Sequence, residues 1–92
     1  MSEVPRVVSV EVLQGARVRL RFKDGTVGDV DLSHLPSEGP VFEQLSDPAY
    51  FRRVRVSRTL GTIVWPNGAD VAPETLYAEA RGEIEASRSI AP

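Results

Sequence analysis

Strict alternation of apolar and polar side chains is the feature that most constrains how this 92-residue chain can fold. It runs from Arg6 to Phe22, with a break at Gln14–Gly15, and resumes from Thr26 to Leu32. Because successive strand residues point to opposite faces of a sheet, this period of two predicts three half-buried strands in an antiparallel sheet. The predicted core face carries Val8, Val10, Val12, Ala16, Val18, Leu20, Phe22, Val30 and Leu32.

A glycine at the end of each predicted loop sets the register of two hairpins. In the loop Lys23–Gly25, the glycine stands where a type I turn is followed by a left-handed residue. This loop pairs Phe22 with Thr26, Leu20 with Gly28, Val18 with Val30, Arg19 with Asp29 and Arg17 with Asp31. The same rule predicts the loop Leu13–Gly15, which pairs Val12 with Ala16, Val10 with Val18 and Glu11 with Arg17. Register matters because a one-residue slip would turn every apolar side chain toward water.

The polar face of the second strand carries Arg17, Arg19 and Arg21. Alternate arginines on one strand could follow the phosphates of a nucleic acid. The predicted register instead places acidic residues opposite them, at Glu11, Asp29 and Asp31. We therefore interpret the row as a solvated sheet face with cross-strand ion pairs, each contributing roughly 0.2–1 kcal/mol.

Helical spacing replaces the alternation in the middle of the chain. From Pro40 the apolar residues Val41, Phe42 and Leu45 lie three and four apart. Asp47 followed by Pro48 is typical of an N-cap and a first helical turn, and predicts a second short helix to about Arg53. The segment from Val54 to Arg58 then alternates as a strand, and we expect Val56 to lie opposite Val64.

The stretch from Leu60 to Tyr77 combines a strand, a sharp turn and the start of a helix. Thr62–Trp65 has the composition of a strand, which should end or reach a sheet edge at Pro66 because proline cannot donate to a ladder. Asn67–Gly68 predicts a turn, and Pro73 suits the first turn of a helix running to about Arg81.

The predicted fold class is α+β. We expect a curved antiparallel sheet, with a three-stranded meander plus a second hairpin, short helices between them and a C-terminal helix. Residues 1–81 are expected to form a single domain, because a chain of this length can bury one core. Residues 82–92 are interpreted as a flexible tail.

Composition narrows the classes of function. The chain has no cysteine, which excludes disulfides, thiolate metal sites and cysteine nucleophiles. No apolar run approaches the ~18 residues of a membrane span, so we expect a cytoplasmic protein with no membrane partner. The net charge of −2 argues against binding the phosphate backbone through bulk charge. Direct nucleic-acid binding is therefore not expected without a partner.

Four segments read P-R-V-V-S-V, F-K-D-G-T-V-G-D-V-D-L, G-P-V-F-E-Q-L-S-D-P-A-Y-F and G-T-I-V-W-P-N-G-A-D-V-A-P-E-T-L-Y. Together they resemble a small bacterial family known as domain of unknown function 2442, over about Val4 to Tyr77. The resemblance implies an α+β domain with a curved antiparallel sheet. It also implies a domain that occurs alone, ahead of a helix-turn-helix segment, or beside another small protein in pairs that look like toxin–antitoxin modules. The family has no established catalytic residues, so the resemblance carries none over.

Three functions from different classes remain open. We favour a non-catalytic protein-interaction module, such as the antitoxin-like member of a gene pair. The partner of this module would be another small protein, or a second copy of the chain in a homodimer. The alternative is a small-molecule-sensing regulatory domain with a pocket near Trp65 and Asp70, to which Asn67 and Tyr77 would also contribute. A third possibility is a hydrolase or transferase that uses Asp70 or His34.

Each of these candidate residues also has an interpretation in which it only stabilises the fold or lies exposed. Trp65 has the size and apolarity of a core aromatic residue, and Asp70 can accept backbone N–H bonds in the turn before the last helix. A lone histidine in a polar loop, such as His34, is more often exposed than catalytic. No catalytic residue, cofactor or metal ligand is predicted.

Overall fold

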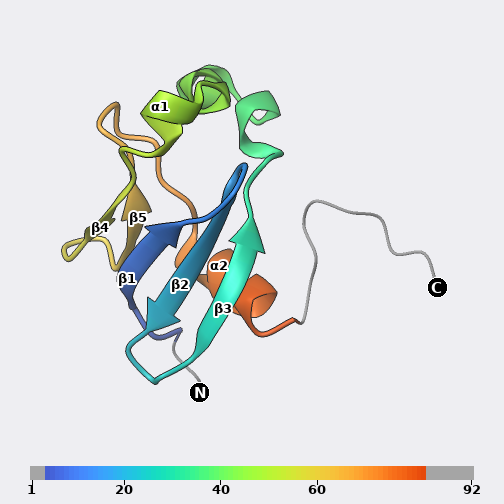
Figure 1. Ribbon diagram of the computed structural model, residues 1–92. Coiled ribbons are helices and arrows are strands. Elements are labelled where there is room, and N and C mark those ends of the chain that lie inside the picture. Colours follow the sequence, from blue (N-terminus) through green and yellow to red (C-terminus); the bar gives the residue numbers. More distant parts are fainter. Residues whose placement is uncertain (1–3, 83–92) are drawn as a thin grey trace.

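The computed structural model describes residues 4–82 (Figure 1). The elements in chain order are β1 (Val7–Val12), β2 (Arg17–Phe22), β3 (Val27–Asp31), the 3₁₀ helices η1 (Leu35–Ser37) and η2 (Pro40–Ser46), α1 (Pro48–Phe51), β4 (Arg55–Ser57), β5 (Thr62–Val64) and α2 (Pro73–Ala80). Strands β1, β2 and β3 form a three-stranded antiparallel sheet, and β4 and β5 form a separate hairpin. The predicted α+β class, with a three-stranded antiparallel sheet, a second hairpin and a C-terminal helix, is confirmed. The helix η1 was not predicted from the sequence.

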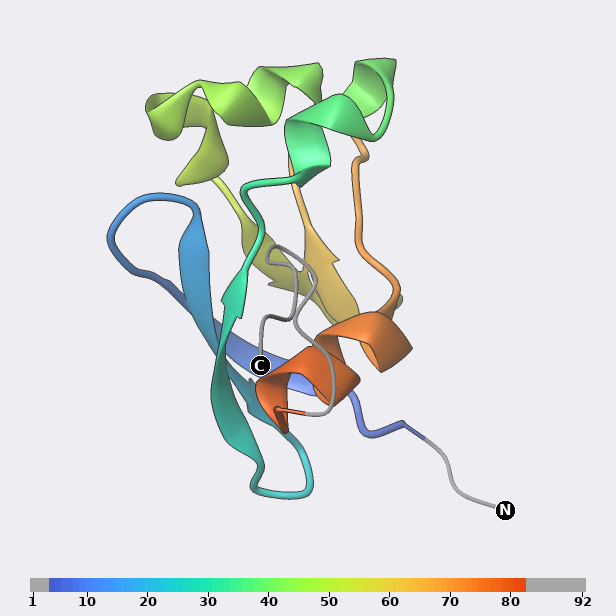
Figure 2. The same cartoon turned by 90° about the vertical axis from the view of Figure 1, so that its right-hand side faces the viewer.

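Two structural layers enclose the core. Figure 2 shows α2 lying against the three-stranded sheet, while η1, η2 and α1 gather at one end of the molecule. On α2, Leu76 is buried, and Tyr77 and Ala80 are half-buried against the core. Within residues 4–82, no helix is both long and apolar enough to cross a membrane. The predicted tail falls almost entirely outside the described residues, and the single-domain boundary stays a prediction.

The hairpin of β2 and β3 has the predicted register throughout. Arg17 pairs with Asp31, Val18 with Val30, Arg19 with Asp29 and Leu20 with Gly28. The Phe22 N–H donates to the Thr26 carbonyl over 2.8 Å, which closes the three-residue loop. Gly25 has a φ of 94°, in the left-handed region that the loop type requires.

The predicted register of the first hairpin is wrong by two residues. Val12 lies opposite Val18, and Glu11 lies opposite Arg19. The Leu13 N–H donates to the Arg17 carbonyl over 2.8 Å, so Gly15 (φ 69°) occupies the middle of the loop. A two-residue shift leaves each side chain on its own face, so the apolar pattern could not distinguish the two registers.

A β-bulge reverses the predicted facing of Val8. The β1–β2 register shifts between Val7 and Ser9, and the extra residue turns Val7 into the core and Val8 outward. Val10 and Val12 still pack against the core, as predicted. The strict alternation read from the sequence therefore begins only after the bulge.

The pairing predicted for β4 and β5 is wrong by one residue. Val56 lies opposite Ile63, and Val64 lies opposite Arg55. The three residues of β5 are all buried, so the strand is covered on both faces. A strand without a polar face carries no alternation, and its parity cannot be read from apolar residues alone.

The helical segment begins at Pro40 and Pro48 as predicted, but α1 ends at Phe51 rather than near Arg53. The Asp47 side chain accepts a hydrogen bond from the Ala49 N–H over 3.0 Å, which confirms it as the N-cap of α1. The segment from Pro40 is a 3₁₀ helix rather than an α-helix, and with three residues per turn it leaves Val41 exposed while burying Leu45.

Candidate functional site

Trp65 is a core residue in this fold. Its side chain is 1% exposed, and its indole Nε1 donates to the Phe51 carbonyl over 2.9 Å. The Phe51 ring lies 5.7 Å from the indole, measured between centroids. These contacts attach the end of α1 to the residue that follows β5, and they leave almost none of the indole open to a ligand.

Asn67 connects the turn after β5 to the helical segment. Its Oδ1 accepts from the Ala69 N–H over 3.0 Å, which holds the turn. Its Nδ2 donates to the Val41 carbonyl over 2.9 Å and to Gln44 Oε1 over 3.0 Å. Its backbone N–H donates to the Tyr50 hydroxyl over 2.8 Å. Asn67 therefore uses both ends of its amide for internal bonds.

Tyr77 lies on the sheet side of the molecule. Its hydroxyl donates to Asp24 Oδ2, and its ring packs edge-on against Phe22 with centroids 5.0 Å apart. The Tyr77 hydrogen bond, followed by that from the Thr26 N–H, lowers the pKa of the Asp24 carboxyl. The bond ties the last helix to the β2–β3 turn.

Asp70 and His34 are the two residues considered for catalysis. Asp70 is exposed and forms an isolated bridge with Val64, and its carboxylate makes no hydrogen bond to the described residues. The turn that Asp70 was expected to hold is held by Asn67 instead. His34, expected to be exposed, is half-buried, and its Nδ1 has no partner in the described part of the chain.

The four predicted site residues do not come together in one place. Trp65 and Asn67 contact the helical segment, whereas Tyr77 contacts the β2–β3 turn. No hydrogen bond or ring contact among residues 4–82 joins Tyr77 or Asp70 to the other two candidates. A ligand pocket built from all four remains a prediction that these contacts do not support.

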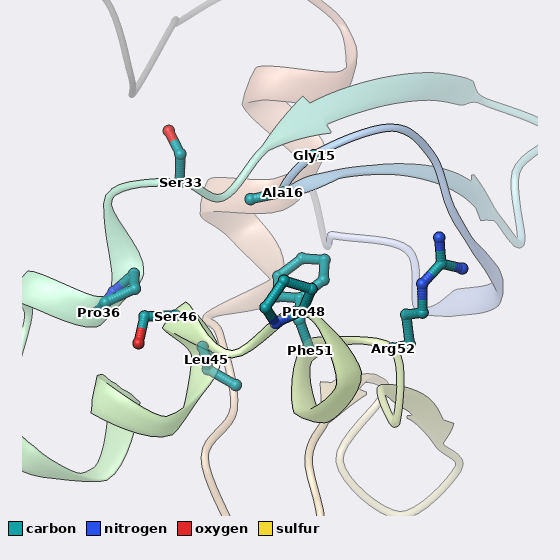
Figure 3. A pocket seen from close by; sticks show the side chains of 9 residues that line it. All are labelled: Gly15, Ala16, Ser33, Pro36, Leu45, Ser46, Pro48, Phe51 and Arg52. Atoms are coloured by element: carbon teal, nitrogen blue, oxygen red, sulfur yellow. The ribbon is translucent and has the colours of Figure 1, made fainter.

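A hollow of about 450 Å³ lies elsewhere, between the β1–β2 loop, the segment after β3 and the helix α1 (Figure 3). Its apolar lining comes from Ala16, Pro36, Leu45, Pro48 and Phe51. Figure 3 shows Ser33 and Arg52 at opposite margins. Sequence reasoning missed this hollow because three segments distant in the chain form it, and no pattern along the chain shows that they meet.

A second exposed feature surrounds the bulge in β1. Val4 (40% exposed), Val8 (44%) and Leu60 (52%) are three of the five large hydrophobic residues most exposed on the described surface. Two shallow hollows that share Arg6 bring these residues together with Arg58 and Lys23. We call Val4, Arg6, Val8, Lys23, Arg58 and Leu60 the docking surface. The adjacent valines Val7 and Val8 were the available sequence signal, because two successive apolar residues break the alternation.

The arginine row is partly neutralised by one carboxylate. Arg19 binds Asp29 through Nε (2.8 Å) and Nη2 (3.3 Å), and Arg17 Nη2 lies 3.8 Å from Asp29 Oδ2. The Arg19 hydrogen bond is the main cause that lowers the pKa of Asp29 and raises that of Arg19. Arg17 lies opposite Asp31 in the sheet register, as predicted, but its ion pair is with Asp29.

The family model of DUF2442, "Protein of unknown function", matches residues 7–82. The chain belongs to this family. No curated protein matches this DUF2442 domain.

One solved structure is similar in sequence and fold. It is the crystal structure of a Nitrosomonas europaea protein named "Putative DNA Binding Protein", which is 27% identical with a TM-score of 0.74. The match covers 90% of the DUF2442 chain and 54% of the other, so this chain spans about half the length of that neighbour.

Proposed function

We propose that this DUF2442 domain is a non-catalytic protein-interaction module that binds an acidic, partly apolar segment of another small protein through the docking surface. The observation that carries the proposal is the exposure of Val4, Val8 and Leu60 beside three cations. Exposed apolar side chains that lie near charged ones are typical of protein-binding sites. We expect the interaction to take place in the cytoplasm.

The charges of the docking surface favour an acidic partner. The side chains of Arg6, Lys23 and Arg58 form no ion pair or hydrogen bond with the described residues. The net charge of −2 would favour a basic partner. However, charges farther than about 8–10 Å are largely screened at physiological salt, so the local cations determine the fit.

The resemblance to paired gene products suggests where the partner is encoded. If this domain is the antitoxin-like member of such a pair, the partner is the product of the adjacent gene. A second copy of this chain is the other candidate, and light scattering on the purified protein distinguishes a homodimer from a hetero-complex.

The name of the solved neighbour, "Putative DNA Binding Protein", raises a separate question for this chain. That protein is named for DNA binding, and this chain matches 54% of it. On this domain, Arg17 and Arg19 are engaged with Asp29. We therefore expect the isolated domain to show no binding of duplex DNA at 150 mM salt in a fluorescence-anisotropy titration.

Affinity purification from cells that express the protein natively tests the proposal. The tagged domain is compared with Leu60→Asp on the docking surface and with Val41→Asp as a matched control. Val41 is 43% exposed and lies on η2, outside the docking surface. We expect one partner to be retained by the parent and by Val41→Asp, and to be lost with Leu60→Asp and at 0.5 M salt. Retention by Leu60→Asp, loss from both variants, or no partner at all would contradict the proposal.

A further inference from the structure

We propose that the hollow between the β1–β2 loop and α1 binds a small carboxylate with an apolar body, such as a medium-chain aliphatic acid. The site shares no residue with the docking surface, and the inference is independent of the proposed function. Its volume of about 450 Å³ is within the usual range for small-molecule sites.

The shape of the hollow is held by the fold. Its floor contains Leu45 and Phe51, both nearly fully buried in the core. Two of its walls are Pro36 and Pro48, whose φ angles are restricted by their rings, and the third is Ala16. Because Leu45 and Phe51 belong to the core, the floor of the hollow presents a fixed apolar surface to a ligand.

Arg52 supplies the only formal charge among the lining residues (Figure 3). Its side chain has no hydrogen bond or ion pair with the described residues, and no acidic residue lines the hollow. The neighbouring Arg53 differs, because its guanidinium lies 5.8 Å from the centre of the Tyr50 ring. The dipole of α1 also stabilises a cation at the C-terminal end of this helix, where Arg52 lies, but that role does not require an adjacent apolar hollow.

One guanidinium beside apolar walls favours a carboxylate over a phosphate. A guanidinium can bind both oxygens of a carboxylate with two parallel hydrogen bonds. A phosphate carries more charge and more acceptor oxygens, and it is usually met by several cations or backbone N–H groups. The apolar lining accommodates the hydrocarbon part of the ligand.

The core provides a reporter for occupancy. Phe51 lines the hollow, and its carbonyl accepts the indole N–H of Trp65, the only tryptophan in the chain. A group that presses on Phe51 therefore changes the environment of a single indole N–H resonance. The amides of Ala16 and Arg52 report on the two sides of the hollow.

The test is an NMR titration of the full chain with octanoate, and with octanamide as the uncharged control. We expect octanoate to shift the signals of Ala16, Arg52 and the indole N–H saturably. We also expect octanamide to bind about tenfold more weakly, because it lacks the charge-assisted bond. Arg52→Gln should weaken octanoate binding by about tenfold, while Arg53→Gln and Leu60→Asp leave it unchanged.

Three outcomes would overturn the inference. They are the absence of saturable shifts at millimolar octanoate, equal binding of octanamide, and equal effects of Arg52→Gln and Arg53→Gln. Arg52→Gln tests the carboxylate site, whereas Leu60→Asp tests the docking surface. Failure of one proposal can therefore be distinguished from failure of the other.

Discussion

Replacing Gly28 by alanine tests how closely α2 packs on β3. A Cβ at this position would meet the backbone of Ala80, overlapping its carbonyl oxygen and lying 2.8 Å from its C and Cα atoms. Ordinary contact begins at 3.4 Å, so the end of the helix must retreat by at least 0.6 Å. Gly28 does not have a positive φ, and alanine therefore meets no backbone strain there.

The expected cost follows from two opposing effects. Overpacking of this kind destabilises by about 1–3 kcal/mol, and the retreat of α2 also weakens the 3.0 Å bond from the Asp31 N–H to Glu79 Oε2. Replacing glycine recovers about 0.4–1 kcal/mol, because it restricts the unfolded chain. We expect a net loss of about 1–2 kcal/mol in the free energy of unfolding, or about 4–16 °C in Tm for a domain of this size.

Thermal unfolding followed by circular dichroism measures this change, with Val27→Ala as the control. Val27 is the neighbouring residue of β3, and its side chain is 46% exposed. Native-state hydrogen exchange should show faster opening of the α2 amides in Gly28→Ala than of the β2 amides. A variant as stable as the parent, with unchanged exchange in α2, would refute the close packing of α2 on β3.

Three further predictions follow from the same structure. Trp65→Ala should reduce the free energy of unfolding by about 3–5 kcal/mol in urea titrations. Trp65→Phe should cost less, since it keeps an aromatic ring in the core while losing the bond to the Phe51 carbonyl. Near-native stability of Trp65→Ala would contradict a buried indole. Gly25→Val should cost about 1–2 kcal/mol from its φ of 94° alone, and an unchanged Tm would contradict the three-residue loop. The Tyr77 hydroxyl lowers the pKa of the Asp24 carboxyl, so the contribution of ionised Asp24 to stability is complete above the ordinary carboxyl range and is lost as the pH falls through the lowered pKa. Asp24→Asn should therefore make Tm fall less than in the parent between pH 5 and pH 2. An identical fall in parent and variant would contradict the role given to this hydrogen bond.

At the β2–β3 hairpin, two sequence rules agree, and the sequence alone was sufficient to predict the register. The alternating faces and the left-handed Gly25 select the same register, which the structure has. At the first hairpin, two registers that differ by two residues keep the same faces, and only the contacts of the Leu13–Arg17 turn decide between them. The doubly buried β5 carries no face information at all.

The candidate site was less predictable than the fold. Trp65 and Tyr77 stand out by residue type, yet both make internal contacts that stabilise the fold. The docking surface depends on the bulge that turns Val8 outward, and the hollow depends on segments that meet only after folding. A bulge and a tertiary hollow both arise from packing, which a pattern along the chain does not record.

Photo-crosslinking at the docking surface tests the protein-interaction proposal most directly. A benzophenone amino acid is placed at Leu60 (52% exposed) or, as the control, at Val27 (46% exposed) in cells that express the protein natively. We expect a crosslink from position 60 to one small protein, through a peptide containing acidic and apolar residues, with none from position 27 and with loss on Arg58→Glu. Crosslinks from position 27 alone, the same products from both positions, or a product from position 60 that survives Arg58→Glu would contradict the proposed surface.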